Sequence, residues 1–193
     1  MADAFLAEAD RKRLIWLAKD RLQRAQIGSE TKVLETSEAR SNSDAYLAPT
    51  DVPEAAALMA RIAPIVGLSA SHGEGVSVLR YTAGQEFKPH VDGIWSGASE
   101  MARTQFEADG GQRLFTTIVY LNAVDGGGAT VFPRLNLNVP PNPGRLLLFA
   151  NSAAGSSDVT PEAIHAAEPV TKGEKWAAVC WWRERAFAGS AHR

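Results

Sequence analysis

The sequence has 193 residues, of which 45% are apolar and 22% charged, and its formal net charge is −2. This length suits one domain with a hydrophobic core, so we expect residues 1–193 to fold as a single domain. With 20 basic and 22 acidic residues there is no electrostatic footprint for nucleic acid or an anionic membrane, and neither is expected as a partner. Apolar runs such as Leu146 to Ala150 are too short to cross a bilayer.

The N-terminal residues and the cysteine content both favour a cytoplasmic protein. Residues 1–13 lack a basic segment followed by an apolar stretch, so they do not resemble a signal peptide. Cys180 is the single cysteine and cannot form an internal disulfide, which favours a reducing compartment. The sequence leaves the oligomeric state open.

Residues 1–70 are expected to form helices that support the rest of the domain. Near the start, apolar residues recur at three- and four-residue spacing among charged ones, at Leu14, Ala18, Leu22 and Ala25. A second helix is expected to begin near Asp51, which resembles an N-cap with Glu54 as its reciprocal partner. Pro64 should kink or end this second helix, because proline lacks the amide hydrogen that an inner turn needs.

From residue 75 onward the sequence consists of short extended segments divided by Gly, Pro, Asn and Asp. Many short strands separated by turn residues indicate a sandwich or barrel. Helices followed by strands indicate an α+β protein in which the N-terminal helices buttress a β core at 75–185. Residues 93–112 interrupt this core with a long Gly- and Ser-rich stretch, which is expected to be a substrate loop. The strands are expected near 75–81, 86–92, 113–122, 128–132, 135–139, 144–150, 164–171 and 175–184.

A metal site is indicated by His90, Asp92 and a distant histidine, His165, in a strand-like segment. Positions i and i+2 of a strand point to the same face, so His90 and Asp92 can aim at one point. Two imidazoles and one carboxylate on one face of a metal are the ligands of non-haem Fe(II) oxygenases. Such a triad leaves coordination positions open for a 2-oxo acid and O₂. The pair alone is a weak signal, and the prediction depends on the whole set.

Lys175 completes that set, because it follows a turn signal at residues 171–174 and opens a new strand. We expect this strand to pair antiparallel with the strand that carries His165. By alternation one face carries Lys175, Ala177, Val179 and Trp181. If that face lines the barrel, the buried ammonium needs an anion, and the distal carboxylate of 2-oxoglutarate would supply it. The ordinary alternative is a solvated surface lysine.

Taken together, these motifs resemble the 2-oxoglutarate/Fe(II)-dependent dioxygenase superfamily, and within it the catalytic domain of the prolyl 4-hydroxylase alpha subunit. The resemblance covers nearly the whole chain, and it implies a double-stranded β-helix (jelly-roll) core. It is carried by residues 40–47, 81–92, 110–113, 120–122, 127–132, 144–149, 165–170 and 173–176.

The resemblance also implies a role for each matching residue. The implied roles fall on His90, Asp92 and His165 for Fe(II); on Lys175, Tyr81 and Thr130 for 2-oxoglutarate; and on Arg113, Trp181 and Phe87 for the substrate. In this assignment Lys175 binds the far carboxylate and Tyr81 donates a hydrogen bond to the same molecule. The sequence departs from the family pattern at Phe87, where a tyrosine is often found, at Ala129 in place of a glutamate, and at Ala167 in place of a glycine.

The implied reaction is hydroxylation of a peptide or protein proline, in which O₂ and 2-oxoglutarate are consumed, succinate and CO₂ are released, and ascorbate serves as reductant. A free amino acid or another small molecule is the alternative substrate. Base repair is disfavoured, because Lys175 stands where those enzymes use arginine and no basic patch is present. Halogenation is disfavoured by the presence of Asp92, and a non-catalytic metal- or peptide-binding barrel is a remote alternative.

Overall fold

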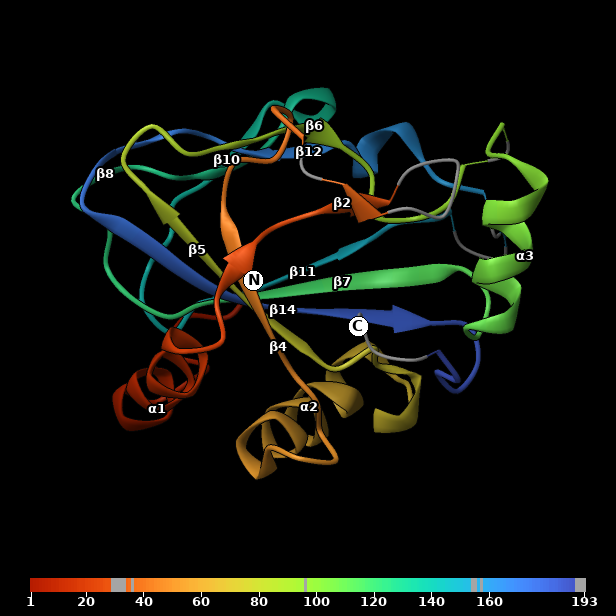
Figure 1. The fold of residues 1–193 in the computed structure, drawn as a ribbon, viewed down its shortest axis with the longest axis horizontal. Helices are drawn as coiled ribbons and strands as arrows, with labels where there is room; N and C mark the ends of the chain where they lie inside the picture. Colours follow the sequence, from red (N-terminus) through yellow and green to blue (C-terminus); the bar gives the residue numbers. More distant parts are fainter. Residues whose placement is uncertain (29–33, 36, 96, 154–155, 157, 190–193) are drawn as a thin grey trace.

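Two antiparallel sheets form the body of the protein, as seen in a computed structural model that describes residues 1–28, 34–35, 37–95, 97–153, 156 and 158–189 (Figure 1). The major sheet has six strands in the order β1-β4-β5-β14-β7-β11, and the minor sheet has four in the order β10-β9-β12-β6. Two short ribbons, β13-β8 and β2-β3, accompany them. The expected architecture, an α+β double-stranded β-helix, is the one observed.

The strands are short, as the turn residues between them require. Those of the major sheet are β1 (Gln23–Arg24), β4 (Ser43–Leu47), β5 (Val76–Thr82), β7 (Arg113–Tyr120), β11 (Leu146–Ala150) and β14 (Glu174–Arg183). Those of the minor sheet are β6 (Phe87–His90), β9 (Thr130–Phe132), β10 (Leu137–Val139) and β12 (His165–Ala167). The ribbons are β2 (Ile27–Gly28) with β3 (Leu34–Glu35), and β8 (Gly126–Gly127) with β13 (Val170–Lys172). Single 3-10 turns lie at Ala70–His72, Pro133–Leu135 and Pro161–Ala163.

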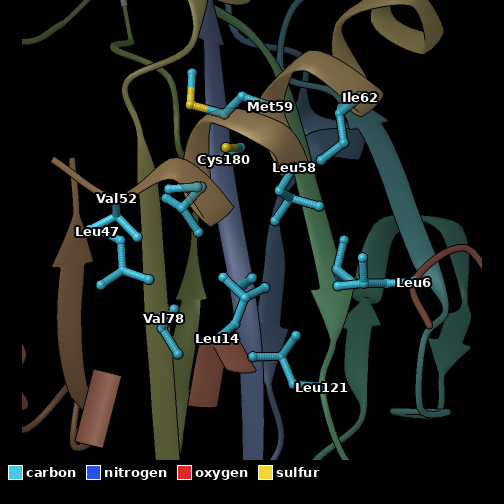
Figure 2. Packing of buried hydrophobic residues seen from close by; sticks show 14 of the residues in the cluster. Leu6, Leu14, Leu47, Val52, Leu58, Met59, Ile62, Val78, Leu121 and Cys180 are labelled. Carbon is cyan, nitrogen blue, oxygen red and sulfur yellow. The ribbon is translucent and has the colours of Figure 1, made fainter. Parts of the chain in front are cut away.

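Two helices, α1 (Glu8–Lys19) and α2 (Pro53–Val66), cover the outer face of the major sheet (Figure 1). Their buried side chains join the outward side chains of the sheet in one apolar cluster. Figure 2 shows part of this packing, with Leu14, Leu58, Met59 and Ile62 lying against the sheet residues Val78 and Cys180. Among the described residues, no helix has both the length and the hydrophobicity that a bilayer crossing requires.

Both helices differ in detail from the sequence expectation. Helix α1 ends at Lys19, so Leu22 and Ala25 lie beyond it, and the chain then joins the major sheet through β1 and β4. The N-cap of α2 is Val52 rather than Asp51, and no side chain caps it. Glu54 instead accepts a hydrogen bond from Arg13 of α1, because its carboxylate faces that helix. Pro64 lies within the last turn of α2, which continues to Val66.

β14 lies at the centre of the major sheet and separates the two apolar clusters of the protein. Its residues alternate as expected: Trp176, Ala178, Cys180 and Trp182 pack toward the helices. The face toward the minor sheet carries Lys175, Ala177, Val179 and Trp181. This alternation places the ammonium of a lysine between the two sheets.

One further expectation about the β core, the strand pairing of β14, is wrong, whereas the role of residues 93–112 toward a substrate stays a prediction. β14 pairs with β5 and β7, whereas the strand of His165 pairs with β6 and β9 in the other sheet. The reason is that the chain crosses from one layer to the other between β12 and β14. Residues 93–112 are not an irregular loop throughout, because they contain helix α3 (Glu100–Ala108), whose N-cap hydroxyl at Ser99 accepts a hydrogen bond from the Ala102 amide. Residue 96 of this stretch lies outside the described residues.

Candidate metal and cosubstrate site

A cavity that is partly open to solvent lies between the two sheets. It is the kind of concave and mostly apolar site that holds small ligands through a few convergent polar groups. All three residues predicted as metal ligands line it, together with five of the other predicted site residues. These eight are His90, Asp92, His165, Lys175, Tyr81, Thr130, Trp181 and Phe87.

The three predicted metal ligands meet at one end of this cavity. One possible ligand atom of each residue lies within 4.8 Å of those of the other two. His90 Nε2 is 3.6 Å from Asp92 Oδ1, and His165 Nε2 is 3.6 Å from Asp92 Oδ2. The pairing of β12 with β6 sets His165 directly opposite His90, which brings the two imidazoles together despite their separation in sequence.

Hydrogen bonds orient both imidazoles for a metal. The Nδ1–H of His90 donates to the Lys88 carbonyl at 2.8 Å, and that of His165 donates to the Ala163 carbonyl at 2.9 Å. With the proton on Nδ1, each ring keeps its lone pair on Nε2, the atom that faces Asp92. The donor set of two neutral nitrogens and one carboxylate oxygen fits Fe(II).

The electrostatics of the triad also suit metal binding. Burial, reinforced by the charge of His165, lowers the pKa of His90 to about 4, so its ring is neutral at pH 7. Burial alone would raise the pKa of Asp92. The charges of His165, His90 and Arg113 and a hydrogen bond from Thr116 outweigh that effect and lower the pKa of Asp92 to about 2. At neutral pH both groups are therefore in the protonation states that a metal ion requires.

Asp92 is not on the strand that carries His90, contrary to the alternation expected from the sequence. β6 ends at His90, and Asp92 lies in the bend that follows. Its position is fixed by β7 instead: the Thr116 hydroxyl donates to Oδ2 at 2.7 Å, and Arg113 Nη1 donates to the Asp92 backbone carbonyl at 3.1 Å. Only 8% of the Asp92 side chain is exposed.

Lys175 lines the same cavity and is almost completely buried. The residue is 3% exposed, and its Nζ lies 5.1 Å from the ring centre of Tyr81 and 5.6 Å from that of Tyr120. Burial lowers the pKa of Lys175 to about 7, although the charge of Glu168 opposes that effect. Within the described residues, no acceptor forms a hydrogen bond or ion pair with Nζ. A buried ammonium in this state favours an incoming carboxylate.

Tyr81 and Thr130 lie beside this lysine, as their expected roles require. Tyr81 is directly opposite Lys175 in the pairing of β5 with β14, and burial raises the pKa of its hydroxyl, which stays a neutral donor. Thr130 Oγ1 accepts a hydrogen bond of 2.7 Å from the Tyr120 hydroxyl. Thr130 is 2% exposed, so this hydrogen bond between β7 and β9 is buried.

The residues expected to face a substrate fall in two places. Phe87 stacks on the ring of His90, with centroids 3.5 Å apart and planes 13° from parallel. Trp181 lines the cavity, and its buried Nε1 has no hydrogen-bond partner among the described residues. Arg113 is not among the cavity residues: its Nε and Nη2 donate to the Glu74 carboxylate at 2.6 and 2.7 Å. Its predicted contact with a substrate stays a prediction.

The sequence patterns did not indicate the buried residues whose hydrogen bonds fix Asp92 and Arg113 in place. Glu74 is buried and accepts hydrogen bonds from both Arg113 and Arg183. Thr116 and Asn151 are completely buried and form a chain of hydrogen bonds that ends at the Asp92 carboxylate. Each looks like an ordinary polar residue in the sequence, since its partners are far away along the chain. The alternation along β7 was the available signal, because it places a threonine among apolar core residues.

Comparison with known proteins identifies relatives of this arrangement. The chain is 35% identical over 171 residues to the mouse prolyl 4-hydroxylase subunit alpha-1, covering 88% of this chain and 31% of that one. It therefore spans about a third of the mouse protein. It is 32% identical over 197 residues to the probable prolyl 4-hydroxylase 3 of Arabidopsis thaliana, covering 92% of this chain and 66% of the relative.

A solved structure shares the fold almost from end to end. It is the viral collagen prolyl hydroxylase of Paramecium bursaria chlorella virus 1 in complex with 2OG, with a TM-score of 0.72 and 26% identity. The match covers 93% of this chain and 92% of that one. Residues 76–183 match the family model described as 2OG-Fe(II) oxygenase superfamily, which confirms the resemblance and the expected cofactors Fe(II) and 2-oxoglutarate. The chain belongs to the 2OG-Fe(II) oxygenase superfamily.

Proposed function

We propose that this protein hydroxylates a proline in a peptide or protein, with Fe(II) held by His90, Asp92 and His165 and with 2-oxoglutarate as cosubstrate. The observation that carries the proposal is one cavity that holds this triad and the ammonium of Lys175, which has no partner among the described residues. The relatives' names, prolyl 4-hydroxylase and collagen prolyl hydroxylase, support a prolyl target.

Each residue contributes a distinct physical step. The triad binds Fe(II), which supplies the oxidative chemistry when O₂ and 2-oxoglutarate are present. Lys175 pairs with the far carboxylate of 2-oxoglutarate, and the Tyr81 hydroxyl donates a second hydrogen bond to it. The apolar wall between the sheets, which includes Leu79 and Ile118, excludes water from the reacting atoms. Substrate enters on the side lined by Trp181.

The test is oxygen incorporation into defined substrates. Purified protein with Fe(II), 2-oxoglutarate and ascorbate is incubated with proline-rich peptides and, separately, with free amino acids including proline. A peptide that gains the mass of one oxygen atom, with an equal amount of succinate, is the expected result. Oxygen gain on free amino acids alone would replace the peptide with a small-molecule substrate. Bound metal without succinate under every condition would indicate a non-catalytic barrel.

Trp181 offers a variant specific to the substrate side. Trp181→Phe keeps an aromatic ring beside Arg113, whose guanidinium carbon lies 4.3 Å from the Trp181 ring centre, but removes the unpartnered N–H. The KM for peptide is expected to rise by roughly tenfold, because the smaller ring loses apolar contact with the peptide worth about 1–2 kcal/mol. Succinate release without peptide should stay near that of the wild type. Trp16→Phe, an exposed tryptophan on α1, is the matched control.

Binding of 2-oxoglutarate is expected to weaken about tenfold from pH 6 to pH 8. Only the protonated ammonium attracts the carboxylate, and the pKa of Lys175 is about 7 before binding. Calorimetry on Mn(II)-loaded protein without O₂ measures both the affinity and the proton taken up. The titratable groups that face Lys175 are Glu168, whose charge favours the ammonium form, and Tyr81 and Tyr120, whose raised pKa values keep them neutral. Lys175→Arg stays charged throughout and should abolish the pH dependence, whereas a pH-independent wild type would contradict the assignment.

Ascorbate as reductant and a cytoplasmic location belong to the same proposal. The buried thiol of Cys180 donates to the Gly75 carbonyl, and burial raises the pKa of that thiol, so it stays protonated and unreactive. That environment suits a reducing compartment. Omitting ascorbate from the peptide assay shows whether sustained turnover depends on it.

A further inference from the structure

The carboxylate of Asp92 is held by a buried chain of two residues that no sequence motif indicated. The Thr116 hydroxyl donates to Asp92 Oδ2 at 2.7 Å, and the Asn151 side-chain amide donates to Thr116 Oγ1 at 3.0 Å. Thr116 and Asn151 are both completely buried. They come from β7 and from the end of β11, neither of which supplies a metal ligand.

The direction of this chain follows from the chemistry of the three groups. A hydroxyl has one proton to donate, and an amide nitrogen can only donate. Because Asn151 donates to the threonine oxygen, the threonine proton is directed to Asp92. The backbone of Asn151 is fixed in turn, since its N–H donates to the Leu114 carbonyl at 2.8 Å and its carbonyl accepts from the Thr160 N–H at 3.0 Å.

Asn151 carries a further sign of a specific role. Its side-chain oxygen is buried and has no hydrogen-bond partner among the described residues. A buried polar atom without a partner is unfavourable, so an apolar residue would suit the packing better unless the amide nitrogen is needed. Within the part of the chain that the structure describes, that nitrogen donates a single hydrogen bond, to Thr116.

We propose that Thr116 and Asn151 are positioning residues that make Asp92 a one-oxygen metal ligand. Each carboxylate oxygen lies 3.6 Å from one imidazole, Oδ1 from His90 Nε2 and Oδ2 from His165 Nε2. The Thr116 hydroxyl engages Oδ2, whereas Oδ1 accepts no hydrogen bond from the described residues and is left to bind the metal. A carboxylate that bound through both oxygens would fill a coordination position that 2-oxoglutarate and O₂ require. The inference rests on the metal site of the proposed function but not on the identity of the substrate.

The test uses Co(II) as the probe, because its visible absorption reports coordination number and its affinity can be measured without turnover. Thr116→Val keeps the shape and removes the donor. It is expected to weaken Co(II) binding by ~10- to 100-fold, the range seen when an outer-shell partner of a metal ligand is lost. Its Co(II) absorption should also shift as Asp92 rearranges. Thr116→Ser restores the hydroxyl and should restore both the affinity and the spectrum.

Asn151→Asp tests the direction of the chain with an almost isosteric change. A carboxylate at this position accepts the threonine proton and draws it away from Asp92, so the Co(II) spectrum and affinity should change as in Thr116→Val. The matched control is Thr117→Val. Thr117 is the next residue of β7 and is equally buried, but its hydroxyl donates to the Cys180 carbonyl and accepts from Trp182 Nε1. This control should bind Co(II) as the wild type does.

The possible results separate the two proposals. Wild-type affinity and spectrum in Thr116→Val, or equal losses in Thr117→Val, would overturn the positioning role and leave the metal site intact. Failure of the wild type to bind Co(II) would overturn the metal site and the positioning role together. If Thr116→Val does not fold, as judged by circular dichroism, Asn151→Asp and Thr116→Ser decide the question. Failure of peptide hydroxylation alone would leave these binding results unchanged.

Discussion

Asp92→Ala is expected to lower 2-oxoglutarate-dependent succinate release by more than ~100-fold, which exceeds the effect of losing an outer-shell partner. Three protein ligands leave no redundancy, and two histidines without an anion bind a divalent ion weakly. Among the described residues, no other carboxylate lies with the two imidazoles, so none can replace Asp92 as a ligand. Succinate release and Co(II) titration measure the loss in turnover and in affinity.

Asp10→Ala is the control for that variant, because Asp10 is an exposed acidic residue on α1, far from the cavity in the sequence. It should retain both activity and metal binding. Circular dichroism shows whether the Asp92→Ala chain is folded. Substantial turnover by a folded Asp92→Ala protein would mean that the iron is held elsewhere, and the proposed site would have to be abandoned.

Lys175→Met is expected to abolish 2-oxoglutarate binding and at the same time to stabilise the fold. Methionine fills a similar volume without bringing a charge between the sheets. Replacing buried charges by apolar side chains stabilises proteins by on the order of 1–4 kcal/mol. Each kcal/mol corresponds to a rise in Tm of about 2–4 °C for a chain of this size. Thermal unfolding and calorimetry with 2-oxoglutarate measure the two effects separately.

The stability difference should depend on pH in a defined direction. The pKa of Lys175 is lowered from 10.5 in the unfolded chain to about 7 in the fold, so the unfolded chain binds more protons between these values. Burial of Lys175 therefore destabilises the wild type fully below pH 7 and progressively less as the pH rises toward 10.5. The gain in Lys175→Met should fall over that window. Lys172→Met, at an exposed position of β13, is the control and should change neither property. A Lys175→Met protein that is less stable than the wild type at pH 6 would contradict this account.

Local sequence patterns were sufficient to predict the strands after residue 75 and the face of β14 that lines the cavity, but not β1 and β4, which lie in the segment expected to be helical. Strand periodicity, turn residues and the side-chain alternation of Lys175, Ala177, Val179 and Trp181 all depend on neighbours within a few residues. The union of His90, Asp92 and His165 was predictable for a different reason. Two histidines and one aspartate in this pattern are typical of a metal site, and the family resemblance fixed their order along the chain.

Interactions between distant segments were not predictable in this way. Strand alternation correctly predicted that Asp92 points toward His90, but for the wrong reason. Asp92 lies beyond the end of β6 and is held in place by Thr116 and Arg113. The expected pairing of the strands of His165 and Lys175 failed because chain order does not show where a chain crosses between sheets. Helix α3 was not predicted, because its N-cap, Ser99, lies in a Gly- and Ser-rich stretch where a serine does not stand out as a helix start.

The two histidines belong to the minor sheet, whereas the residues that fix Asp92 belong to the major sheet. A ferrous ion shared by these three ligands would thus act as a cross-link between two layers that are otherwise joined by apolar contacts and by hydrogen bonds such as the one from Tyr120 to Thr130. Binding to the native state alone stabilises a fold by an amount that grows with free ligand concentration. The free energy of unfolding of this protein would accordingly depend on the supply of iron. Loss of the metal would weaken the association of the two sheets as well as abolish turnover.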